Sequence, residues 1–310
     1  MKYGYYIRAA YKYPAIRDLA VRAERYGFDS VHVNDHLIGF DPERKQPYLE
    51  AIALMSAIAA MTQQVKIGHI VLANSYRNPA LTAKIISSID HISDGRALCW
   101  VGAGWYKEEY EAYGYPFPSA KQRVDELEES LIIFKKLFTE TVTNFHGQFW
   151  ILKNCKNFPK PIQQPWPPIV IGASKKRLTT IACRDADGIN LPDSSISILK
   201  TRIRFITSQL EKYNRDPEQF EISTFNDITL IKTQDELDAI VDQKIQQAKR
   251  QNEDRTKEQI LQNSFIGYVN DVIDKMREME ECNVKRMVIQ VHGSPSIKDP
   301  LQLFHDKIMR

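Results

Sequence analysis

Short apolar runs alternate with amphipathic helical patterns along the whole chain, and this alternation limits the possible fold more than any other feature. Helix 15–26 is an example, with Ile16, Leu19 and Ala23 on one face and Gly27 at its end. The runs that favour strands are 3–8, 30–34, 65–72, 97–103, 168–172, 187–191, 220–231 and 286–292. Eight strands separated by helices are typical of parallel β-α-β units, and their number favours a (β/α)8 barrel, the TIM barrel.

A doubly wound nucleotide-binding sheet is the alternative α/β fold. Such a sheet ordinarily carries a glycine-rich turn after its first strand. Here the turn reads RAAYKYPA and contains no glycine. We therefore predict a single domain over residues 1–310, with an insertion at 139–166 in which NFHGQFW indicates a hairpin turn.

Charge and composition exclude several classes of function. The 310 residues carry a net charge of +3, with basic and acidic side chains interspersed, so a nucleic-acid partner is not expected. No apolar stretch reaches the length of a membrane span, and MKYGYYIRAAYKYP lacks the core of a secretory signal. The four cysteines share no metal-ligand or redox spacing, so we expect a cytoplasmic protein without a structural metal.

The run SVHVNDHL begins as a buried strand and ends in the titratable pair Asp35 and His36. Strand alternation places Val31, Val33 and Asp35 on one face and His32, Asn34 and His36 on the other. We expect the valines to pack against helices, and His32 and Asn34 to point into the barrel. Two interpretations of the pair stay open at this point: a site at the strand's end, or a core histidine beside a helix-capping aspartate.

Two small-residue turns follow other strands. Residues 102–105 (GAGW) form a Gly-x-Gly turn that would let the backbone approach a flat or anionic ligand, although an ordinary tight turn has the same pattern. Residues 172–174 (GAS) precede a helix whose first amides could bind an anion, with Ser174 as a possible cap and Lys175, Lys176 and Arg177 beside it. An ordinary capped helix is the alternative. In a barrel these strand ends meet at one mouth, which predicts a phosphorylated cofactor and proton-coupled chemistry there.

Several motifs occur together in an order that is far more specific than any one of them. They are SVHVNDHL, IGHIVLANSYRNPALTAKIISSIDHISDGRALCWVGAGWYKEEYEAYGYPF, FHGQFW, NFPKPIQQPWPPIVIGAS and ADGINLP, followed near the end by SFIGYVNDVIDKMREMEECNVKRMVIQVH. In this combination the chain resembles the bacterial luciferase-like superfamily, and within it the deazaflavin-dependent oxidoreductases. Only residues 193–263 lie outside the resemblance.

The resemblance implies a (β/α)8 barrel, commonly dimeric, with a flavin or coenzyme F420, a deazaflavin, bound at its mouth. His36 would be the proton donor or acceptor, a role suited to a side chain that ordinarily titrates near neutral pH. Asp35 would orient neighbouring groups or help to bind the ring. A non-proline cis peptide at His69–Ile70, or one bond later, would support the ring. Gly172, Ala173 and Ser174 would hold the cofactor's phosphate.

One departure from the family bears on the cofactor. The flavin-using members carry an arginine for the FMN phosphate at the position of Ala103, and this chain has Gly102, Ala103 and Gly104 there. The resemblance therefore favours F420 over FMN, and a hydride-transferring oxidoreductase that acts on a small organic substrate. An FMN-dependent monooxygenase and a non-catalytic cofactor-binding protein are the alternatives. Trp105 replaces a glutamate of the sugar-phosphate dehydrogenases and would form an aromatic pocket wall, unless it packs into the helix layer. No feature selects the substrate.

Overall fold

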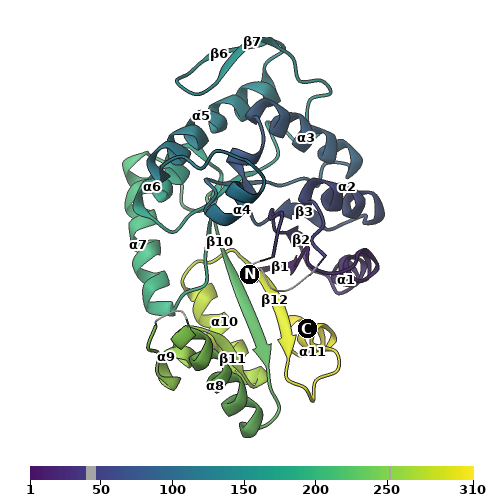
Figure 1. The fold of residues 1–310 in the computed structure, drawn as a ribbon, viewed down its shortest axis with the longest axis vertical. Helices are drawn as coiled ribbons and strands as arrows, with labels where there is room; N and C mark the ends of the chain where they lie inside the picture. Colours follow the sequence, from purple (N-terminus) through teal and green to yellow (C-terminus); the bar gives the residue numbers. More distant parts are fainter. Residues whose placement is uncertain (40–46, 251–252) are drawn as a thin grey trace.

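The predicted apolar runs form a ring of parallel strands in the computed structural model, which describes residues 1–39, 47–250 and 253–310 (Figure 1). Around the ring, the strands are β1 (Lys2–Ile7), β2 (Ser30–Val33), β3 (Lys66–His69) with β4 (Leu72–Ala73), β5 (Cys99–Gly102), β8 (Ile169–Gly172), β9 (Gly188–Leu191), β10 (Glu221–Leu230) and β12 (Arg286–Gly293). Because β3 and β4 are two halves of one barrel position, the ring has the eight positions predicted.

The third barrel position is where the ring closes. β3 pairs with β2, its Ile67 bridges to Ala97, and β4 then pairs with β5. Between the halves lies a cis peptide bond at Ile70–Val71, the second of the two positions expected. The single predicted strand 65–72 is therefore interrupted at this bond.

Helices follow the strands as predicted and surround the ring (Figure 1). They are α1 (Tyr13–Arg25), α2 (Ala51–Met61), α3 (Pro79–Ile92), α4 (Lys107–Ala112), α5 (Ala120–Thr139), α6 (Lys176–Asp185), α7 (Ile196–Lys212), α8 (Gln234–Arg250), α9 (Lys257–Gln262), α10 (Val269–Glu281) and α11 (Pro300–Phe304), with short turns at Asn74–Tyr76 and His305–Met309. Their starts have a chemical cause: α3 begins at Pro79 after Asn78, whose side chain accepts the Ala80 amide hydrogen bond. Among the described residues, no helix is long and apolar enough to cross a membrane.

Two apolar layers hold the barrel together. The larger layer lies between strands and helices and includes Val31 and Val33. The smaller layer fills the interior around Tyr6, Leu98, Trp100, Val170 and Val288. His32 is fully buried against Trp100, with 4.5 Å between ring centroids. Its side chain therefore points into the barrel and the two valines point toward the helices, as predicted for strand 30–34.

Residues 139–166 contain the predicted hairpin, formed by β6 (Thr143–His146) and β7 (Ile151–Cys155), at the top of Figure 1. A further strand, β11 (Phe265–Gly267), pairs with the end of β10 and was not predicted. Three residues are too few to show a period, so the sequence pattern could not distinguish this strand from a loop.

Candidate active site

A cavity of about 530 Å³ opens where the strands end. Its lining includes nine of the residues predicted for the site: His36, Ile70, Gly102, Ala103, Gly104, Trp105, Gly172, Ala173 and Ser174. The remaining lining residues are Tyr6, Asn34, Val71, Leu178, Asn190, Pro192 and Phe225. The turns after β5 and β8 thus meet β2 and the third strand at one mouth, as expected for this fold.

Val71 forms part of the cavity wall between two glycines. A Cβ at Gly102 would lie 2.7 Å from Cγ2 of Val71, and one at Gly172 would lie 2.8 Å from the same atom. Any larger residue would displace Val71, so both positions require glycine. Gly104 has a φ of 77°, which a side chain rarely tolerates. The Gly-x-Gly turn is therefore required by close approach and by backbone shape, and its surface toward the cavity is smooth and apolar.

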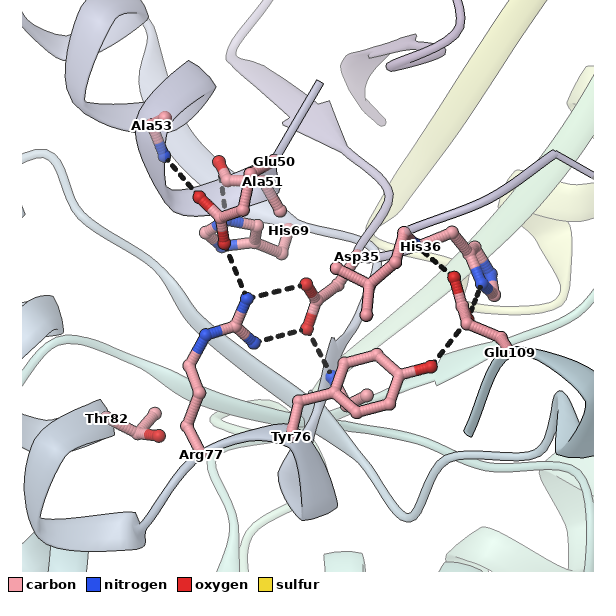
Figure 2. Close-up of polar contacts among 12 residues, drawn as sticks. Asp35, His36, Glu50, Ala51, Ala53, His69, Tyr76, Arg77, Thr82 and Glu109 are labelled. Atoms are coloured by element: carbon pink, nitrogen blue, oxygen red, sulfur yellow. Dashed lines mark hydrogen bonds and ion pairs between the residues drawn. The ribbon is translucent and has the colours of Figure 1, made fainter. Parts of the chain in front are cut away.

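Asp35 does not line the main cavity. Its two oxygens accept hydrogen bonds from Arg77 at 2.7 and 2.9 Å, and one also accepts the Ala73 amide at 2.8 Å (Figure 2). Arg77 also contacts Glu50 at 2.8 Å, and Glu50 caps α2 through the Ala53 amide. Asp35 is 3% exposed, so this buried carboxylate joins the end of β2 to the third strand and to α2.

A smaller hollow of about 80 Å³ adjoins the cavity, and Asp35 borders it together with His36 and Trp105. His69 lies outside both spaces and is fully buried, with Nε2 3.4 Å from the Ala51 carbonyl. Burial lowers the pKa of His69 to about 4 because a charged imidazolium would lose its hydration there. The structure therefore does not bring His69 to the cavity wall.

His36 is held by a carboxylate that the sequence analysis did not single out. Nδ1 of His36 lies 2.9 Å from Oε2 of Glu109, which is fully buried (Figure 2). Glu109 also accepts hydrogen bonds from the Tyr76 hydroxyl and from the amides of Leu37 and Ile38. Burial alone would raise the pKa of Glu109, but the hydrogen bonds from His36, Tyr76 and the Leu37 amide bring it below its usual range. Glu109 is thus a carboxylate.

This contact sets the orientation of the imidazole. A carboxylate can only accept, so Nδ1 carries the hydrogen of the neutral imidazole. One pattern could have revealed Glu109. Residues 106, 109 and 113 share one face of the short helix 106–113, and Tyr106 and Tyr113 make that face aromatic except for a single carboxylate.

The turn at 172–174 differs from its prediction in two details. The N-cap of α6 is Lys175 and no side chain caps the helix, so Ser174 does not act as the cap. Arg177 forms an ion pair with Asp125, while Lys175 and Lys176 are exposed. Ser174 itself is exposed and borders the cavity beside these two lysines, whereas the Ala173 amide donates to the Asn190 carbonyl at 3.0 Å.

Trp105 lies on the cavity wall and is 64% exposed. Its ring meets the His36 ring edge-on at 5.9 Å between centroids. It does not pack into the helix layer, and this favours the aromatic-wall interpretation. The described residues contain no group of three or more His, Cys, Asp or Glu side chains placed to bind a metal ion.

The chain is similar to known proteins in sequence and in fold. The sequence model of the family described as "Luciferase-like monooxygenase" matches residues 2–296. An F420-dependent glucose-6-phosphate dehydrogenase of Amycolatopsis mediterranei is 36% identical over 193 residues, which are 61% of this chain and 56% of the relative. An FMNH(2)-dependent dimethylsulfone monooxygenase of Pseudomonas putida is 29% identical over 60% of this chain and 51% of its own length. The matches thus span about half the length of these curated relatives.

Solved structures share the whole fold. An F420-dependent secondary alcohol dehydrogenase in complex with an F420-acetone adduct superposes with a TM-score of 0.86 over 99% of this chain and 98% of its own, at 20% identity. The coenzyme F420-dependent tetrahydromethanopterin reductase from Methanopyrus kandleri gives a TM-score of 0.81 at 18% identity, over 99% and 98% of the two chains. At these identities the likeness establishes the barrel, as predicted from the sequence, and not the activity.

Proposed function

Because the chain belongs to the luciferase-like monooxygenase family, we propose that it is an oxidoreductase that transfers a hydride between coenzyme F420 and a small organic substrate. The observation that carries the proposal is the His36–Glu109 pair on the cavity wall, 2.9 Å apart. A hydride transfer to or from a carbonyl or hydroxyl carbon needs one proton to move at the oxygen. A fixed imidazole at the cavity meets that need.

The part of the cavity formed by β2, the third strand, β5 and β8 suits a flat cofactor. Val71 with Gly102 and Gly172 provides a smooth apolar surface for one ring face, and Ser174 with Lys175 lies where an anionic tail could bind. The deazaflavin, when bound, supplies a two-electron hydride carrier at one ring carbon. The chain's own residues would bind and orient it, and His36 would exchange the proton.

F420 is preferred to FMN for two reasons. By the family resemblance, Ala103 occupies the place where the flavin-using members carry an arginine for the FMN phosphate. The relatives named F420-dependent also include the match of 36% identity, compared with 29% for the FMNH(2)-dependent one. A homodimer, a cytoplasmic location and a small-molecule substrate are further proposals that rest on the family resemblance.

The test is a turnover assay with the purified protein. Oxidised F420 is mixed with a panel of alcohols and reduced F420 with ketones, imines and activated alkenes, and the absorbance of the deazaflavin is followed. We expect reduction or oxidation of F420 with at least one compound, without oxygen. Turnover seen only with reduced FMN and oxygen would establish the monooxygenase instead. Binding of F420 or FMN with no turnover across the panel would favour a cofactor-binding protein.

A further inference from the structure

Two barrel strands, β10 and β12, continue past their neighbours at the mouth (Figure 1). They pair with each other as far as Leu230 and Gly293. By contrast, β9 pairs with β10 only up to Thr224, and β1 pairs with β12 only up to Ile289. The later residues of β10 and β12 therefore form a wall that extends beyond the rest of the ring.

The inner face of this wall can be followed from the register. Phe225 and Val288 are partners and both belong to the apolar cluster inside the barrel. Side chains two residues apart on a strand share a face. Asp227 and Gln290, which are also partners, thus face inward one layer nearer the mouth, and His292 follows at the rim.

Two acceptor atoms on this face have no donor. Oδ1 of Asp227 and Oε1 of Gln290 are both buried, and neither accepts a hydrogen bond from the described residues. Gln290 is 3% exposed, whereas the Asp227 side chain is 45% exposed, and Nε2 of His292 lies 3.6 Å from Asp227 Oδ1, within ion-pair distance but beyond hydrogen-bond range. Acceptor atoms that the protein itself leaves unpaired are unfavourable, so two on neighbouring residues indicate a place where donors from another molecule bind.

The wall lies across the ring from the groups that would hold the cofactor. Those groups come from β2, the third strand, β5 and β8, which are consecutive around the barrel. β10 and β12 belong to the other half, and Phe225 of β10 lines the cavity between the two halves. A substrate that meets the cofactor in the cavity would extend toward this wall.

We propose that Asp227 and Gln290 form a substrate subsite that binds hydroxyl groups, and that the substrate is an uncharged, hydroxyl-bearing compound and not a phosphate ester anchored here. The proposal rests on the proposed function for its substrate role. A carboxylate and an amide oxygen attract hydrogen-bond donors, and the charge of Asp227 repels a phosphate or carboxylate. Two adjacent acceptors can receive two hydroxyls of one molecule.

The test measures binding to the cofactor-free protein, so it does not depend on turnover. Glycerol and glycerol 3-phosphate are titrated by ligand-observed NMR against the wild type, Asp227→Leu, Asp227→Asn and Gln290→Leu. Asp235→Asn is the matched control, since Asp235 is an exposed carboxylate at the start of α8. We expect glycerol to bind more tightly than its phosphate. Each leucine substitution should lower the affinity for glycerol by about tenfold, the usual value of a hydrogen bond to a charged or buried group. The control substitution should leave this affinity unchanged.

Three results would overturn the subsite. Glycerol 3-phosphate could bind the wild type more tightly than glycerol, glycerol could fail to bind the wild type, or both leucine variants could bind glycerol as tightly as the wild type does. Thermal melting of each variant reports folding, and Asp227→Asn, which keeps the side-chain shape, takes the place of Asp227→Leu if that variant fails to fold. A parallel F420 titration separates the two proposals. If glycerol binding depends on Asp227 but the wild type binds no F420, the subsite stands and the proposed function fails.

Discussion

Two polar regions lie at the mouth of the barrel, and they differ in how completely the chain satisfies its own hydrogen bonds. On the β2 side, both oxygens of Asp35 and both oxygens of Glu109 accept hydrogen bonds from named donors (Figure 2). On the β10–β12 side, Asp227 Oδ1 and Gln290 Oε1 have none among the described residues. The first region is fixed before any ligand arrives, and the second is completed by one.

The difference agrees with the work that each region would do. Acid–base chemistry requires an imidazole held in one orientation, and a paired buried carboxylate provides this at no cost during the reaction. Recognition of a substrate requires groups whose hydrogen bonds are made only on binding. Changes to the first region should therefore alter turnover and stability, whereas changes to the second should alter substrate affinity.

Replacing His36 should have the largest effect. His36→Asn keeps a polar side chain but cannot exchange a proton near neutral pH, so turnover should fall by roughly 10²- to 10⁴-fold with F420 affinity unchanged. Turnover is measured from the steady-state absorbance of F420, and F420 affinity is measured by fluorescence titration. His146→Asn, on the exposed hairpin, is the control. Wild-type turnover in a variant that unfolds more easily would make His36 a structural histidine.

Breaking the Asp35–Arg77 pair should mainly affect stability. Asp35→Asn removes the buried charge that pairs with Arg77 and leaves Arg77 only the partly exposed Glu50, and we expect the free energy of unfolding in urea to fall by about 3–5 kcal/mol. Asp274→Asn, an exposed carboxylate on α10, should change it by less than about 0.5 kcal/mol. A loss below about 1 kcal/mol for Asp35→Asn would show that the pair does not fasten β2 to α2.

Glu109 should act through His36 and so have a smaller effect on the rate. Glu109→Gln keeps the shape but removes the charge beside the imidazole, and we expect turnover to fall by about tenfold. The pH–rate profile should also move to lower pH, because the protonated imidazole loses its counter-charge. Glu108→Gln, an exposed neighbour on α4, is the matched control. An unmoved profile with lower stability would reduce Glu109 to a purely structural residue.

The two histidines buried below the site, His32 and His69, should make the stability of the fold sensitive to acid. Burial lowers the pKa of His32 to about 3 and that of His69 to about 4. Between about pH 6.5 and those values the unfolded chain binds protons that the folded chain does not, so stability falls as the pH falls. The melting temperature from pH 7 to 4.5 should drop less steeply in His32→Gln than in the wild type. If the melting temperature falls equally steeply with pH in both proteins, the buried His32 does not cause the sensitivity to acid.

The sequence predicted the barrel and most of the cavity lining because both depend on local pattern. Alternation in 30–34 fixed which side chains face inward, and the small residues at 102–104 and 172–174 marked the turns that form the mouth. The family resemblance added His36 and the cis peptide, whose bond lies at Ile70–Val71.

Pairings between distant residues could not be predicted in this way. Glu109 is 73 residues from His36, and Arg77 is 42 from Asp35, so no spacing along the chain joins them. Asp227 and Gln290 become neighbours only through the register of β10 with β12. His69 shows the converse: its place in a strand suggested the site, but its side chain faces α2 and lies away from the cavity.

The most direct measurement is a fluorescence titration of F420 and FMN with the purified protein, beside its Ser174→Asp variant. F420 should bind at least about tenfold more tightly than FMN, a difference of about 1.4 kcal/mol. Ser174→Asp should lower the affinity for F420 by charge repulsion. It should not change the melting temperature of the protein, because a helix N-terminus tolerates an acid. Tighter binding of FMN, or equal F420 affinity in the variant, would contradict the assignment of this mouth to a deazaflavin.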